Sequence, residues 1–123
     1  MSYAPFVPLR VFSAFTMLEG AIEPKKIPAQ AKKLGFPAIA MCDRNGLYGV
    51  MAFQDACKAE GVQPIIGVLL AVARPDEALA PNAAPTVDWL ALFAQDDVGY
   101  ANLCALVSHA HLDRPLAFEA HIP

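Results

Sequence analysis

The chain has 123 residues, which is enough for one domain built around a single core. Its 9 basic and 12 acidic residues give a formal net charge of -3, and no Lys/Arg stripe of the kind that follows nucleic-acid phosphates is present. This disfavours direct DNA binding by the segment. Apolar residues make up 56% of the chain, above the roughly 45–50% that is usual in soluble domains. Either the core is unusually complete, or something outside the chain covers apolar surface.

The sequence also argues against membrane-spanning and secreted proteins. Its longest apolar run, residues 65–73, is far shorter than the roughly 20 residues of a membrane span, and the opening MSYAPFVPL lacks the regions of a secretory signal. Cys42, Cys57 and Cys104 are odd in number, far apart and without CxxC spacing, so we expect reduced packing residues. A cytoplasmic protein with no membrane contact is expected.

Residues 6–12, FVPLRVF, predict the first strand, with Pro8 near its start, where a missing N–H is tolerated. Arg10 and Phe12 lie two residues apart, so their side chains point to the same face of a strand. Ser13 follows at the carboxyl end, where α/β proteins place their chemistry.

Two strand–helix–strand units are expected in the next part of the chain. The pattern predicts a helix over 23–35 that ends at Gly35, and Pro28 indicates that its regular part begins near that residue. The next elements are a buried strand, a helix and the most apolar strand, over residues 36–42, 47–61 and 62–73. Such units predict a parallel sheet with right-handed crossover helices.

Residues 74–85 show no periodicity and predict a mobile loop. The strand expected over 86–94 should return antiparallel, because no helical pattern precedes it. A helix is predicted over 95–112, with Asp96 and Asp97 at the positive end of its dipole. Its apolar face consists of Tyr100, Leu103, Leu106 and Val107. The last eleven residues predict no element.

The loop CDRNG, residues 42–46, is the segment with the most chemical character. Asp43 could ligate a metal or act as a base, although an Asp before a helix often caps it. His109 and His111 are two apart on a helix and so face different sides, which argues against a shared metal site, and His121 lies in the unpatterned tail. No phosphate-binding glycine motif and no nucleophile motif is found. The residues alone predict an α/β domain without naming its reaction.

Three stretches together resemble one family: FVPLRVFSAFTMLEGAI (6–22), GFPAIAMCDRNGLYGVMAFQDACKAEGVQPIIG (35–67) and LFAQDDVGYANLCALVSHAHL (92–112). They are similar to the N-terminal PHP (polymerase and histidinol phosphatase) domain of the bacterial DNA polymerase III alpha subunit. The resemblance implies that residues 1–123 are the N-terminal portion of a distorted β/α barrel, with mainly parallel strands and crossover helices, truncated before the polymerase domains. An open sheet of this kind would expose apolar surface and favour self-association.

The resemblance also implies where a metal cluster would lie. In family members that retain metal, a His-x-His pair occupies the positions of Arg10 and Phe12, an Asp-His pair those of Asp43 and Arg44, and a glutamate that of Leu69. Phenylalanine and leucine cannot coordinate a dication, and arginine repels it, so Asp43 is the one plausible ligand that survives. The fragment is therefore expected to have no catalytic residues, no metal and no cofactor, while magnesium is expected at the polymerase site of the parent.

A hypothesis for what replaces the metal follows from these substitutions. Arg10, Arg44 or both are expected to pair with Asp43, because a guanidinium can give a carboxylate two parallel hydrogen bonds and keeps its charge. Phe12 and Leu69 would fill the remaining volume. The alternative is that Arg44 points to solvent.

The resemblance implies that the parent is a DNA-directed DNA polymerase, a nucleotidyltransferase that acts in DNA replication. The fragment itself is expected to be a non-catalytic scaffold that helps to dock the proofreading exonuclease subunit and reaches DNA only through the parent. The DRN triplet is also similar to the error-prone paralogue of this polymerase, which works in damage-induced synthesis. A stand-alone PHP phosphoesterase such as histidinol phosphatase is a further alternative, but its metal ligands would have to be present.

Overall fold

The computed structural model describes residues 6–16, 20–74, 86–113 and 120–122. Most of the expected loop over 74–85 lies outside the described residues. The described elements are a short 3₁₀ turn, three helices and three strands, in the order η1 (Pro24–Lys26), α1 (Ile27–Leu34), β1 (Ala38–Arg44), α2 (Val50–Glu60), β2 (Gln63–Ala73), β3 (Val87–Phe93) and α3 (Asp97–Leu112).

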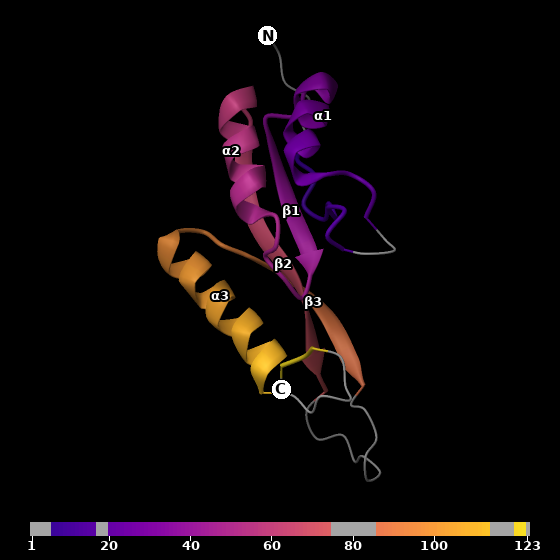
Figure 1. Cartoon of the computed structure of the whole chain (residues 1–123), viewed down its shortest axis with the longest axis vertical. Helices are drawn as coiled ribbons and strands as arrows, with labels where there is room; N and C mark the ends of the chain where they lie inside the picture. Colours follow the sequence, from indigo (N-terminus) through magenta and orange to yellow (C-terminus); the bar gives the residue numbers. More distant parts are fainter. Residues whose placement is uncertain (1–5, 17–19, 75–85, 114–119, 123) are drawn as a thin grey trace.

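The three strands form one mixed sheet in the order β1-β2-β3 (Figure 1). β1 runs parallel to β2, as a βαβ unit predicts, and β3 returns antiparallel to β2, which confirms the expected direction of the last strand. Residues 63–69 of β2 pair with β1, and residues 67–73 pair with β3. The sheet is therefore staggered, and only residues 67–69 of β2 have a strand on both sides. The α/β class is confirmed, and the described strands form an open sheet.

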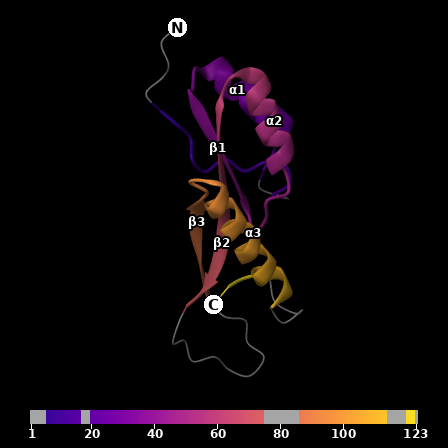
Figure 2. The same ribbon diagram turned by 90° about the vertical axis from the view of Figure 1, so that its left-hand side faces the viewer.

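The helices are divided between the two ends of the staggered sheet. α1 and α2 lie together at one end of the molecule, beside β1 and the first part of β2, and α3 lies at the other end (Figure 1 and Figure 2). None of the helices among the described residues is long and apolar enough to cross a bilayer.

The strand expected over residues 6–12 is wrong as a regular element, since the described part of this segment has no strand assignment. It runs along the outer edge of β1, where the Ala40 N–H donates to Pro8 O at 2.9 Å and the Cys42 N–H donates to Val11 O at 2.9 Å. Successive acceptors are three residues apart in this segment, whereas successive donors are two apart in β1. Because of this mismatch, and because Pro8 has no N–H to donate, no regular ladder forms.

The helix expected over 23–35 is divided in the structure. Residues 24–26 form a 3₁₀ turn, and the α-helix begins at Ile27, so that Pro28 falls in its first turn, where no backbone hydrogen bond is lost. Gly35 ends α1 in the left-handed conformation with φ of 80°, and Gly61 ends α2 in the same way with φ of 71°. At the start of α3, the Asp96 carboxylate accepts a hydrogen bond from the Gly99 N–H at 2.8 Å, which confirms its place at the helix N-terminus.

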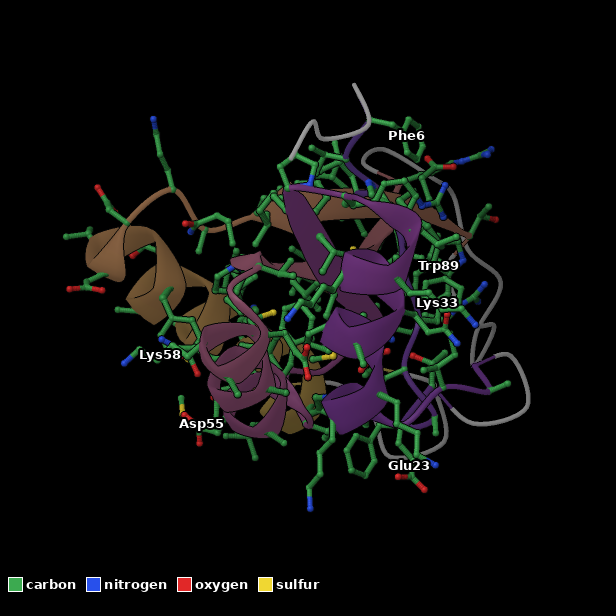
Figure 3. The ribbon with its side chains drawn as sticks, turned by 90° about the horizontal axis from the view of Figure 1, so that it is seen from above. Phe6, Glu23, Lys33, Asp55, Lys58 and Trp89 are labelled. Carbon is green, nitrogen blue, oxygen red and sulfur yellow. The ribbon has the colours of Figure 1, made fainter. Side chains whose placement is uncertain are left out.

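Two groups of buried side chains match the two ends of the staggered sheet. The first packs α1 and α2 on β1 and consists of Ile27, Ala31, Ile39, Met41, Val50, Phe53, Cys57 and Val62. The second packs α3 on β2 and is centred on Leu70, Ala110 and Ala120. Figure 3 shows Asp55 and Lys58 of α2 pointing away from the sheet, which leaves the opposite face of the helix for the core. The thiols are free, with Cys42 and Cys57 buried and Cys104 half-buried.

Candidate functional site

Asp43 is the buried charged residue at the carboxyl end of β1, with 1% of its surface exposed. Oδ1 accepts hydrogen bonds from the Ser13 N–H at 2.6 Å and from the Thr16 hydroxyl at 2.7 Å. Oδ2 accepts one from the Ser13 hydroxyl at 2.6 Å. Both carboxylate oxygens therefore have short hydrogen bonds, which offset the cost of burying the charge.

The short turn over residues 13–16 brings these donors to the carboxylate. The Thr16 N–H donates to Ser13 O at 3.0 Å and the Phe15 N–H to Ser13 Oγ at 3.2 Å, so the turn closes on itself. The Arg44 N–H in turn donates to Thr16 Oγ1 at 3.2 Å. The sequence interpretation assigned no role to Thr16 and only a position to Ser13. A sequence signal for their role did exist. Both are hydroxyl residues that follow an extended segment, and that segment was expected to lie beside a strand that ends in Asp.

The ion pair expected between Asp43 and an arginine is absent among the described residues, where hydroxyl and N–H donors take that place. Arg10 is exposed. Asp43 and Arg44 are consecutive in β1, so their side chains leave opposite faces of the sheet. The alternation of a strand thus separates the carboxylate from the guanidinium that sequence proximity had placed beside it.

The Arg44 side chain lies against aromatic rings. Its guanidinium carbon is 4.4 Å from the centroid of the Trp89 ring and 5.9 Å from that of Phe12. Leu69, which is 1% exposed, is the register partner of Arg44 in β2. The structure therefore brings together Phe12, Arg44 and Leu69, three of the five ligand positions, on the face of the sheet opposite Asp43.

These side chains do not fit a divalent cation. Phe12 and Leu69 have no donor atoms, and Arg44 carries a positive charge. The carboxylate of Asp43 is already occupied by hydrogen-bond donors on the other face. No group of three or more His, Cys, Asp or Glu side chains able to hold a metal lies within the described ranges.

Asn45 is a structural residue beside the site to which the sequence interpretation assigned no role. It has a φ of 51°, a left-handed conformation that Asn tolerates better than most residues. Its N–H donates to Leu69 O at 2.9 Å, its Oδ1 accepts from the Ala71 N–H at 3.2 Å, and its Nδ2 donates to Ala120 O at 3.0 Å. The His111 ring Nε2 lies 2.6 Å from Asn45 O. Asn45 therefore ties the end of β1 to β2, α3 and the segment over 120–122.

The histidines do not converge on one site. His111 contacts Asn45 O, whereas Nδ1 of His109 pairs with the carboxylate of Asp113, the residue that follows the end of α3. Their different partners confirm that the two rings face different sides of the helix. His121 is half-buried in the segment over 120–122.

The Cys42 thiol lies beside the site but is unsuited to nucleophilic chemistry. Burial raises the pKa of Cys42 to about 11, an effect opposed by the charge of Arg10 and reinforced by that of Asp43. Burial likewise raises the pKa of Cys57 to about 11. Both thiols are therefore protonated at neutral pH, in keeping with the packing role expected for them.

A groove of about 410 Å³ lies between α2, the start of β2 and the start of α3. Its polar lining is made of Gln54, Gln63, Gln95, Asp96, Asp97 and Tyr100. Among the described residues that line it there is no histidine, cysteine, lysine or arginine, and burial raises the pKa of Tyr100.

The sequence profile of the PHP domain family matches residues 8–122. The chain belongs to this family. This confirms the resemblance, and it places the Asp43 carboxylate and the Arg44 stack in a PHP fold.

Curated relatives of this PHP chain are DNA polymerases. It is 43% identical over 112 residues to an error-prone DNA polymerase of Anaeromyxobacter sp. (strain K), covering 90% of this chain and 9% of that protein. It is 38% identical over 123 residues to a DNA polymerase III subunit alpha of Caulobacter vibrioides, covering 96% of this chain and 10% of that protein. The chain thus spans 9% to 10% of the length of these relatives.

The PHP fold is also seen in a solved structure. A candidate metal-dependent phosphoesterase from Bifidobacterium adolescentis matches with a TM-score of 0.59 and 16% sequence identity, covering 92% of this chain and 37% of that one. At this identity the likeness concerns the fold alone.

Proposed function

We propose that this PHP chain is part of a DNA-directed DNA polymerase of the replicative alpha-subunit type, and that the segment itself is a non-catalytic scaffold. The polymerase relatives support the first half of the proposal, since they cover 90% and 96% of the chain. The polymerase reaction, with its magnesium ions, would belong to the rest of the parent.

One observation carries the non-catalytic role: the site holds a hydrogen-bonded carboxylate and an aromatic–guanidinium stack where a PHP phosphoesterase needs metal ligands. Ser13 and Thr16 occupy the oxygens of Asp43, and Arg44 lies over Trp89. Phosphodiester hydrolysis at such a site would lack both the ligands and the metal-activated water that it needs.

A metal-binding and hydrolysis assay tests this role. The chain should retain no stoichiometric zinc or manganese after dialysis and should cleave neither DNA 3′ ends nor phosphomonoesters. A PHP protein that keeps the His-x-His pair serves as the positive control. One metal per chain together with hydrolysis would overturn the proposal.

The scaffold role implies a partner. We propose that the complete PHP domain helps to dock the proofreading exonuclease subunit, because a polymerase whose PHP site cannot hydrolyse DNA needs error removal from another protein. The test compares the parent polymerase with a version that lacks residues 1–123, using the exonuclease subunit as the captured partner and retained polymerase activity as the control for folding. Binding should fall on deletion, and unchanged binding would count against docking.

The error-prone paralogue is the second candidate for the parent. It is favoured by the 43% identity to the Anaeromyxobacter protein, compared with 38% to the Caulobacter alpha subunit. Deleting the parent gene distinguishes the two: loss of viability supports the replicative enzyme, and loss of damage-induced mutagenesis alone supports the error-prone one.

A further inference from the structure

We infer that Arg44 is the resident cation of the strand-end site, held between two aromatic rings, and that it locks β3 and the segment over residues 6–16 onto β1. The inference rests on the proposed non-catalytic role, because it assigns a positive use to positions that no longer suit a metal. The participating side chains are Phe12, Arg44, Leu69 and Trp89.

The register of the sheet explains how Arg44 reaches Trp89. Arg44 pairs with Leu69, and Leu69 pairs with Ala91. Trp89 lies two residues before Ala91 in β3, so its side chain lies on the same face of the sheet as that of Ala91. The Arg44 side chain thus crosses over buried Leu69 to reach a strand that is not adjacent to its own. Figure 3 shows Trp89 on the other side of the molecule from α3.

The distances suit a cation–π contact. A guanidinium within about 6 Å of a ring centroid is attracted by the ring quadrupole, and Trp is the strongest aromatic partner. Both rings satisfy this limit, with Trp89 at 4.4 Å and Phe12 at 5.9 Å. Arg is suited to this position because its planar group stacks on rings and stays charged at any physiological pH.

Phe12 gives the stack its second attachment. It lies in the segment that failed to form a strand, which is held to β1 through backbone hydrogen bonds at Pro8 and Val11. Further along, Ser13 and Thr16 bind Asp43 on the opposite face of the sheet. This segment is therefore fixed from both faces of the sheet: by hydroxyls on Asp43 and by a ring on Arg44. A metal would have to be acquired from solution to make such a link, whereas the arginine is part of the chain.

Trp89 is the single tryptophan of the chain, so its fluorescence reports directly on the stack. The experiment compares the emission maximum and the acrylamide quenching of the unchanged chain with those of Arg44→Met, which keeps an apolar stem and removes the charged plane. Arg74→Met is the matched control, because it also removes one positive charge close to Trp89. The Arg74 guanidinium donates a hydrogen bond of 3.1 Å to Asp88, the residue before Trp89. Arg44→Met should shift the emission to the red and increase quenching, and Arg74→Met should leave both near the original values.

A second measurement covers the case in which Arg44→Met fails to fold. Arg44→Lys keeps the charge without the plane and should show a smaller change of the same sign in emission and quenching. Where Arg44→Met does fold, urea unfolding followed by circular dichroism should show that Arg44→Met and Trp89→Leu together lower the midpoint by less than the sum of the two single shifts.

Equal Trp89 spectra for Arg44→Met and Arg74→Met, or additive shifts in the urea midpoint, would overturn the inference. If Arg44→Met does not fold, Arg44→Lys spectra identical to those of the unchanged chain overturn it. Zinc and manganese titrations of the unchanged chain separate it from the proposed function. Metal binding together with hydrolysis would defeat the non-catalytic role, and an Arg44-dependent Trp89 signal in the same chain would still support the stack.

Discussion

Ser13 gives the Asp43 carboxylate two hydrogen bonds of 2.6 Å, one from its backbone N–H and one from its hydroxyl, across 30 residues of sequence. Each bond goes to a different oxygen of the carboxylate. A neutral side chain and a backbone group thus satisfy both oxygens of a buried carboxylate.

Replacing Ser13 by Ala removes the hydroxyl donor from Oδ2 and leaves the N–H bond to Oδ1. Because a hydrogen bond to a buried charge is lost, we expect the free energy of unfolding to fall by about 1.5–3 kcal/mol. Urea denaturation measures this change in the free energy of unfolding. Ser108→Ala, at an exposed position of α3, is the matched control and should change stability by less than about 0.5 kcal/mol. Equal stabilities for the two variants would show that the Ser13 hydroxyl contributes nothing.

Substitutions of Asn45 separate its backbone role from its side-chain role. Asn45→Gly keeps the φ of 51° accessible but loses the bonds to Ala71 N and Ala120 O. Asn45→Ala loses the same bonds and adds a left-handed backbone penalty of about 1–2 kcal/mol. We therefore expect Asn45→Ala to be the less stable variant, as measured by thermal or urea unfolding. The reverse order would mean that the backbone at residue 45 relaxes.

Thiol labelling of the folded chain should distinguish the three cysteines. Cys104 is half-buried, whereas Cys42 and Cys57 are buried and their pKa values are raised to about 11. We expect a thiol reagent at pH 7.5 to modify Cys104 first and the other two only on unfolding, because the thiolate is the reactive form. Mass spectrometry of the digested product identifies the site. Rapid labelling of Cys57 in the absence of denaturant would contradict its burial.

The same thiols predict a loss of stability in alkali. Burial raises the pKa of both thiols from the ordinary value of 9.0 to about 11, so above pH 9 the unfolded chain, in which the thiols are exposed to water, releases protons that the folded chain retains. The free energy of unfolding should therefore be unaffected by these groups below pH 9 and should fall between pH 9 and 11, by at most about 1.4 kcal/mol per pH unit for each thiol. The Cys42→Ala/Cys57→Ala variant should show a shallower decline over this range. Parallel curves for the variant and the unchanged chain would rule out a thiol contribution.

Periodicity and glycine stops were enough to predict most of the elements. Gly61 ends α2 at the expected residue, and the missing helical pattern before β3 correctly predicted its antiparallel direction. The first segment was misread because its apolar pattern suits a strand, whereas strand pairing also needs matched spacing of donors and acceptors. That spacing is fixed by the partner strand and is invisible in residues 6–12 alone.

The candidate site was only partly predictable for a related reason. Asp43 was identified from its place at the end of a strand, but its partners Ser13 and Thr16 lie 30 and 27 residues away. The direction of Arg44 could have been inferred, since consecutive residues of a strand alternate in face. Its contact with Trp89 could not, because it depends on the register of two strand pairs and on the stagger between them.

The stagger makes residues 67–69 of β2 the waist of the molecule. On one side of the waist the sheet is supported by α1 and α2, and on the other by α3. Asp43 and Arg44 pair with Val68 and Leu69, so the strand-end site lies at the waist itself. The two ends are joined there by the backbone hydrogen bonds of residues 67–69, and elsewhere by Tyr100 of α3, which packs against the group of buried side chains around Phe53. The hydroxyl contacts to Asp43 and the Arg44 stack lie there on opposite faces of the sheet, so they hold the first segment of the chain and β3 at the place where the end that carries α1 and α2 meets the end that carries α3.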